Sequence, residues 1–118
     1  MRPHRKLDVW NEAVSFVVDV YQVTRSFPKM EQHALADQLK RAAVSIPSNI
    51  AEGAARQTKK EFIQFLYIAQ GSASEIDTQL EVARRLNYID EGEKARLDHK
   101  LGAIGKMLTG LIRSLKKA

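Results

Sequence analysis

Apolar residues recur every three or four positions through most of this 118-residue chain, and this spacing decides its fold class. An α-helix has 3.6 residues per turn, so residues spaced in this way share one face of a helix. Two runs show the pattern most clearly: Leu66, Ala69, Ala73, Ile76, Leu80 and Ala83, and then Leu97, Leu101, Ile104, Leu108, Leu111 and Leu115. The sequence therefore predicts an all-α protein.

The pattern divides into four helical segments joined by short connections. The segments are residues 7–26, 31–52 and 58–86 and a fourth that opens at Asp90, with connections near residues 27–30, 53–57 and 87–89. Short connections between long amphipathic helices make successive helices antiparallel neighbours. We predict one domain over residues 1–118, an up-down four-helix bundle with residues 1–6 as a flexible basic arm.

Several residues predict where the second and third helices bend, end or begin. Pro47 removes a backbone hydrogen bond and clashes with the carbonyl four residues earlier, so we expect a kink or a break near Ser45. Gly53 is suited to the C-terminal end of that helix. Thr58 and Glu61 form a capping box, in which the hydroxyl and the carboxylate each satisfy a free backbone N–H.

The fourth segment opens with acidic residues between Asp90 and Glu93, which form a second possible cap. It also contains three glycines, Gly102, Gly105 and Gly110, each of which lowers helix propensity by about 1 kcal/mol. We expect these glycines to allow the close approach of a neighbouring helix.

Two segments are more apolar than a monomeric bundle requires. The first helix has only a narrow polar stripe, and residues 62–69 are apolar nearly all round. Large exposed apolar patches are rare in monomers, so we predict a homo-oligomer. The candidate contact residues are Trp10, Phe16, Phe62, Phe65 and Tyr67. The alternative is that both helices occupy central positions in the bundle.

Composition and motifs argue against an enzyme. The chain has no cysteine, which removes disulfides, thiol catalysis and thiolate metal sites and agrees with a cytoplasmic location. His4, His33 and His99 lack the Glu-x-x-His pairing of di-metal bundles, and no phosphate loop or nucleophile elbow is present. No apolar run is long enough to cross a membrane. We therefore expect no catalytic residues, cofactor, metal or small-molecule substrate; Glu52 and Glu75 as paired carboxylates are a weak alternative.

One group of polar residues is unusual because it lies in and beside the apolar faces of the second and third helices. Its members are Ser45, Asn49, Glu52, Ser72, Glu75, Thr78 and Gln79. Helix interiors disfavour Ser, Asn and Thr, so these side chains are expected to satisfy one another across the helix interface. We favour a buried hydrogen-bond network over the alternative of a pocket for a ligand or partner.

The chain is moderately basic, with 19 Lys and Arg against 14 Asp and Glu, a net charge of +5. Local basic clusters give the candidate nucleic-acid-binding residues Lys40, Arg41, Arg56, Lys59, Lys60, Arg84, Arg85, Arg113, Lys116 and Lys117. Aromatic residues are few and expected to be buried, so contacts to the phosphate backbone would dominate over base stacking. For any single cluster the alternative is ordinary solvated helix surface.

Two long runs, residues 38–53 and 69–80, together with Leu7 to Trp10 and Phe27-Pro28, resemble the bacterial family of 23S rRNA intervening sequence proteins. The resemblance implies a left-handed antiparallel four-helix bundle that assembles as a homopentameric ring. Some members of that family are encoded within insertions in the large-subunit ribosomal RNA gene, and no catalytic residues are agreed for it. Similar bundles serve as basic, nucleic-acid-binding accessory proteins of diversity-generating retroelements.

Taken together, the residues and the resemblance predict a non-enzymatic oligomeric bundle. We expect it to bind structured RNA or another nucleic acid through a basic surface that the oligomer repeats. The alternative is a protein-interaction scaffold that binds no nucleic acid and uses the region of Asn49, Glu52, Glu75 and Gln79.

Overall fold

The computed structural model describes residues 2–117, so Met1 and Ala118 lie outside the described residues. The elements in chain order are η1 (Pro3–Lys6), α1 (Asp8–Thr24), η2 (Lys29–Glu31), α2 (Leu35–Ala54), α3 (Lys59–Arg85) and α4 (Glu91–Lys117). The described residues contain four α-helices and no strand, which confirms the predicted all-α four-helix fold.

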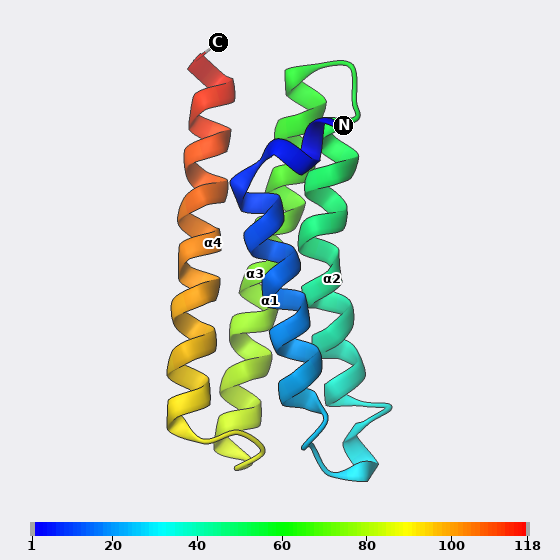
Figure 1. The fold of residues 1–118 in the computed structure, drawn as a ribbon, viewed down its shortest axis with the longest axis vertical. Coiled ribbons are helices and arrows are strands. Elements are labelled where there is room, and N and C mark those ends of the chain that lie inside the picture. The colour runs from blue at the N-terminus through cyan, green and yellow to red at the C-terminus, as the bar shows by residue number, and fades with distance from the viewer. Residues whose placement is uncertain (1, 118) are drawn as a thin grey trace.

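The four helices form an elongated bundle of 46 × 23 × 22 Å (Figure 1). Each helix packs against two others, α1 against α2, α2 against α3, α3 against α4 and α4 against α1, with α2 and α3 in the most extensive contact. Successive helices run in opposite directions, so the chain ends and the α2–α3 turn gather at one end of the bundle (Figure 1). We call this the terminal end; the α1–α2 and α3–α4 connections form the loop end.

The core runs the length of the bundle and takes side chains from every α-helix. In α1 the buried apolar positions are Val9, Ala13, Phe16, Val20 and Val23, whose spacing of three and four residues selects one face, and Thr24 is buried beside them. The other valines of α1 are left partly or fully exposed. The remaining large, fully buried side chains are Leu39, Ile46, Ile50, Leu66, Ile76, Leu80, Leu97, Ile104 and Leu108. Most belong to the apolar runs from which the helices were predicted.

Helix α2 continues through Pro47 as one helix from Leu35 to Ala54, so the predicted alternative of a break near Ser45 is wrong. The Asn49 side-chain amide donates to the Ser45 backbone carbonyl at 2.7 Å, in the turn that contains the proline. Pro47 has no backbone N–H to donate, and this bond adds a side-chain hydrogen bond within the same segment of the helix.

Gly53 does not end α2 as predicted, because it is helical and buried at the contact with α3. A β-carbon at Gly53 would lie 2.8 Å from Phe62 Cδ1 and 2.8 Å from Phe65 Cβ. The glycine is therefore required by the close approach of α2 and α3, and the helix ends one residue later without a residue of positive φ.

The first turns of α3 and α4 are capped by side chains. The backbone N–H of Glu61 donates to Thr58 Oγ1 at 3.1 Å, but the Glu61 carboxylate accepts from the Thr58 hydroxyl and not from the expected backbone N–H. At α4 both bonds of the box form, with Glu93 N donating to Asp90 Oδ1 and Asp90 N to Glu93 Oε1. Both predicted helix starts are confirmed.

The described part of the N-terminal segment, which was predicted as a flexible basic arm, contains a short helix. Pro3–Lys6 form η1, which packs against α1 and α2. The His4 ring lies 4.9 Å from the Trp10 ring, and the Arg5 guanidinium lies 5.2 Å from the same ring. Asn11 donates from its side chain to the Arg5 carbonyl at 3.2 Å. These contacts hold the basic segment on the bundle because its side chains have partners there.

Candidate nucleic-acid interface

The net positive charge of the chain is concentrated in the half of the bundle at the terminal end. That half comprises residues 2–12, 48–72 and 106–117 and carries ten Lys or Arg against four Asp or Glu, a net charge of +6. The half at the loop end, residues 13–47 and 73–105, carries nine Lys or Arg against ten Asp or Glu, a net charge of −1. The bundle is therefore basic at one end and almost neutral at the other.

Six of the ten predicted binding residues lie at the terminal end and are exposed: Arg56, Lys59, Lys60, Arg113, Lys116 and Lys117. Lys59 and Lys60 open α3, where the helix dipole also favours an anion. Within the described residues, only Arg56 in this group forms an ion pair, with Glu52 at 3.4 Å. Of the other five, Lys116 donates a hydrogen bond to the Tyr67 hydroxyl, and the remaining four are available for phosphate contacts.

The list of predicted binding residues missed four other basic residues of the same end, namely Arg2, Arg5, Lys6 and Lys106. The first three were expected in a flexible arm, but η1 fixes their backbone beside α1 and α2. All four residues lie at the terminal end because of the up-down topology, in which the chain returns to the same end after every second helix.

The other four predicted residues lie at the loop end, and three of them are ion-paired. Arg41 pairs with Asp37 at 3.1 Å, Arg84 with Glu91 at 2.9 Å and Arg85 with Glu81 at 2.8 Å. The Lys40 ammonium lies 5.2 Å from the centre of the Tyr21 ring. These residues are therefore poorer candidates for phosphate binding than those of the terminal end.

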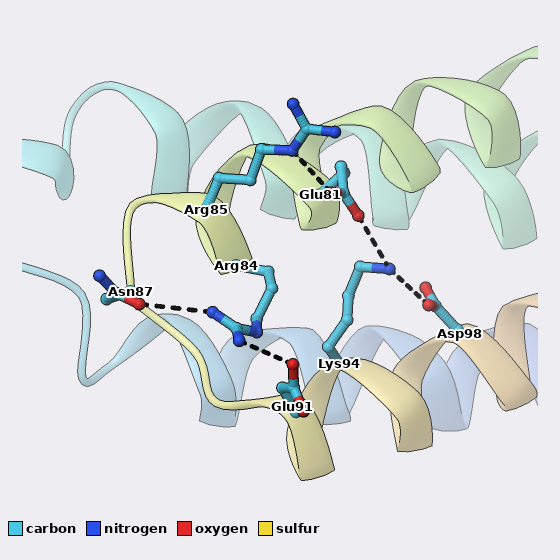
Figure 2. A network of polar contacts seen from close by, with 7 residues as sticks. All are labelled: Glu81, Arg84, Arg85, Asn87, Glu91, Lys94 and Asp98. Atoms are coloured by element: carbon cyan, nitrogen blue, oxygen red, sulfur yellow. Dashed lines mark hydrogen bonds and ion pairs between the residues drawn. The ribbon is translucent and has the colours of Figure 1, made fainter.

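Arg84 and Arg85 belong to a network that joins α3 to α4 near their connection (Figure 2). Lys94 of α4 lies between Glu81 at 3.4 Å and Asp98 at 2.5 Å, and Arg84 also donates to Asn87 Oδ1. Hydrogen bonds from Arg85 and then Lys94 lower the pKa of Glu81. The hydrogen bond to Asp98 is the largest cause of the raised pKa of Lys94. The opposite charges neutralise one another. Two of the ion pairs join a residue of α3 to a residue of α4, so the network links these helices.

The residues of the predicted polar cluster form several separate sets of hydrogen bonds. The Ser45 and Ser72 hydroxyls lie 2.8 Å apart across the α2–α3 contact, and Asn49 donates to Ser45 Oγ at 2.9 Å. This group forms the predicted hydrogen bonds between helices.

The remaining members of the polar cluster bond along their own helices. Gln79 donates to Glu75 at 3.0 Å, Thr78 donates to the Ser74 carbonyl at 3.3 Å, and Glu52 pairs with Arg56. Gln79 is only 7% exposed, and its Oε1 accepts no hydrogen bond from the described residues. The structure thus joins Ser45, Asn49 and Ser72 by hydrogen bonds, and within the described residues no hydrogen bond links Glu52, Thr78 or the Glu75–Gln79 pair to them.

The predicted contact residues for self-association differ widely in exposure. Phe16 is fully buried in the core of its own chain and presents no surface to a partner. Trp10, Phe62 and Phe65 are partly buried, whereas Tyr67 is 42% exposed. The other exposed large apolar side chains were not among the predicted contact residues; they are Val18, Tyr21, Met30, Val44, Ile68, Val82 and Leu86.

A shallow groove runs between α3 and α4. At each of Gly102, Gly105 and Gly110 an added β-carbon would meet no atom within 4 Å among the described residues. The expectation that a neighbouring helix of the same chain approaches these glycines is therefore wrong. They leave a groove of about 930 Å³ with Asp77 and Asp98 toward the loop end.

The described residues contain no group of three or more His, Asp or Glu side chains placed to hold a metal ion. None of the helices within residues 2–117 has the length and apolar character needed to cross a membrane. The structure thus defines a class: an all-α, up-down four-helix bundle with one basic end.

The chain belongs to the family of 23S rRNA-intervening sequence proteins, whose family model matches residues 5–110. It is also similar to a solved protein of unknown function from the S23 ribosomal protein family of Bacteroides thetaiotaomicron. The two share 25% sequence identity with a TM-score of 0.82, over 89% of this chain and 95% of the other. A comparison with curated proteins gives no match.

Proposed function

We propose that this protein is a non-enzymatic bundle that binds structured RNA through its terminal end. The observation that carries the proposal is the division of charge, +6 at the terminal end and −1 at the loop end. The name of the family, which refers to 23S rRNA, supports RNA as the polyanion. The cytoplasm is the corresponding proposed location.

The proposed interface combines three segments that are distant in the sequence. Side chains of η1, of the start of α3 and of the end of α4 each contribute basic groups, and Lys59, Lys60 and Lys117 are exposed on it. Lysine and arginine contacts to phosphates position a protein on a helical nucleic acid without reading its sequence. Binding is therefore expected to depend on RNA shape and on salt more than on base identity.

The proposal predicts a steep salt dependence. If about six phosphates are contacted, RNA affinity falls about a thousandfold between about 50 and 200 mM salt, because bound cations are released on association. Fluorescence anisotropy of a labelled RNA hairpin, titrated with protein at several salt concentrations, measures the slope. Absence of binding at the lowest salt concentration would disprove the proposed function, and binding independent of salt would exclude this interface.

We also propose that the chain self-associates, as a pentamer in line with its family resemblance. Support comes from exposed apolar side chains on α2 and α3. Val44 precedes Ser45, and Ile68 and Val82 lie on the same side of α3, where they are 51% and 41% exposed. Burial of such side chains against a second copy removes apolar surface from water. Phe16 has no part in this proposed surface because it is buried.

Replacement of Ile68 and Val82 by Asp is expected to give a smaller species with unchanged helix content, because charge cannot be buried in the proposed contact. Light scattering measures the mass and circular dichroism the helix content. The matched control is Met30→Asp, a more exposed apolar residue near the loop end, which should leave the mass unchanged. An unchanged mass for the double variant would exclude this contact.

A further inference from the structure

Tyr67 contradicts the expectation that the aromatic residues are buried. It lies on α3 at the terminal end and is 42% exposed. Beside it is a groove of about 500 Å³ between α3 and α4, within the size range of small-molecule sites. The residues that line it are Tyr67, Gln70, Thr109, Ile112, Arg113, Lys116 and Lys117. The groove therefore combines an aromatic ring, three basic side chains and no acidic one.

The position of Lys116 fixes the Tyr67 ring without covering its face. The ammonium donates to the Tyr67 hydroxyl at 2.7 Å and lies 5.4 Å from the centre of the ring. The difference between these two distances is about equal to the distance from the centre of a tyrosine ring to its own hydroxyl oxygen. The ammonium therefore lies in line with the C–O bond, in the plane of the ring, and a flat group can still stack on the ring face.

The rest of the groove suits the other parts of a nucleotide. Arg113 and Lys117 are exposed and form no ion pair within the described residues, so they can bind a phosphate. Gln70 donates to the Thr109 hydroxyl at 3.0 Å across the groove, and these polar groups can also bond a sugar or a base edge. Ile112 supplies an apolar side chain that is nearly buried.

We propose that this groove binds one unstacked nucleotide of RNA, from a loop, a bulge or a strand end. Its base stacks on Tyr67, and its phosphate contacts Arg113 and Lys117. The inference rests on the proposed RNA binding and adds a single-stranded element to the substrate. The wider groove that continues toward the loop end has Asp77 and Asp98 in its lining as well as Lys106 and Arg113, so it is less basic than the groove beside Tyr67.

Tyr21 provides a matched control within the same chain. It is 45% exposed, and a lysine ammonium lies 5.2 Å from its ring centre. It lies on α1 in the half of the bundle with a net charge of −1. The adjacent pocket is lined by Val17, Val18, Tyr21, Gln22 and Arg25, and thus by a single basic residue. The two tyrosines are similarly exposed and each has a lysine beside it, but two further basic side chains line the groove at Tyr67 and only one, Arg25, lines the pocket at Tyr21.

The test compares Tyr67→Leu, Tyr67→Phe and Tyr21→Leu with the unchanged chain, using two RNAs. One RNA is a hairpin with 2-aminopurine in its loop, and the other is a fully paired duplex of equal length. We expect the hairpin fluorescence to be quenched by the unchanged chain, by Tyr21→Leu and by Tyr67→Phe, which keeps the ring. Tyr67→Leu should lose the quenching and bind the hairpin about fivefold or more weakly, with duplex affinity unchanged.

The outcomes separate this inference from the function on which it rests. If Tyr67→Leu still quenches the loop base, or weakens hairpin and duplex binding equally, the nucleotide site is wrong and RNA binding stands. A lower mass of Tyr67→Leu in light scattering would also overturn it, because the side chain would then contact another copy. If the unchanged chain binds neither RNA at low salt, the proposed function fails and this inference fails with it.

Discussion

Charge reversal at the terminal end reduces RNA affinity by about a hundredfold or more at low salt, whereas the same reversal at the loop end has a small effect. The first variant carries Lys59→Glu, Lys60→Glu and Lys117→Glu, which removes three cations from the proposed interface and adds three repulsive charges. All three side chains are exposed and none forms an ion pair within the described residues, so the fold should be unaffected.

The control variant carries Arg25→Glu, Lys29→Glu and Arg41→Glu, three exposed residues of the half at the loop end. Both variants change the net charge of the chain by the same amount, from +5 to −1. Long-range attraction to RNA is therefore lowered equally, and the variants differ in the position of the charges and in the loss of one exposed ion pair, Arg41 with Asp37. Anisotropy titrations of one RNA hairpin with both variants give the comparison. Equal losses of affinity would show that net charge alone governs binding and would contradict an interface at the terminal end.

Replacement of Gly53 by Ala lowers the free energy of unfolding by about 1–2 kcal/mol, although alanine is the better helix former. The added β-carbon would meet Phe65 Cβ and Phe62 Cδ1 at 2.8 Å, closer than carbon atoms pack without displacement. Phe65 Cβ is fixed by the α3 backbone, so relief requires α2 and α3 to move apart. These two helices form the most extensive contact in the bundle, and a shift there disturbs the core.

Gly102→Ala is the control for this substitution, with an expected effect of opposite sign. Gly102 is also helical, but an added β-carbon would meet no atom within 4 Å. Alanine there should raise the free energy of unfolding by about 0.5–1 kcal/mol. Urea unfolding of the two variants at one protein concentration measures both effects, because association would otherwise change the apparent stability. Stabilisation by both substitutions would contradict the close packing at Gly53.

The four helices and the starts of α3 and α4 could be predicted because each depends on residues close together in the sequence, whereas α2 begins at Leu35 and not at residue 31 as predicted. The apolar runs of α3 and α4 and the boxes at Thr58 and Asp90 are patterns within a few turns. The outcome at Gly53 could not be predicted in this way. A glycine near the end of a helix is typical of a helix C-terminus. Only the position of Phe62 on α3 shows why a small residue is needed at position 53.

The candidate interface was predicted in part, for a similar reason. Clustering along the sequence identified Lys59 and Lys117 as candidates and gave Arg84 and Arg85 equal weight. The ion pairs of these two arginines with Glu91 and Glu81 are visible only in the three-dimensional structure. In α1, a narrow polar stripe left too many apolar positions to decide which face is buried. Phe16 was therefore assigned to a surface, although it lies in the core.

The uneven charge gives the molecule an electric dipole directed along its 46 Å axis. A polyanion exerts a torque on this dipole, so the bundle turns end-on before any side chain touches RNA. In an assembly with parallel axes the dipoles add, and one rim becomes strongly basic while the opposite rim does not. In an assembly with alternating axes they cancel. If the proposed oligomer binds RNA as proposed, the number of RNA molecules on each oligomer reports its symmetry: one for a ring whose two faces differ, and two for an arrangement whose two faces are equivalent.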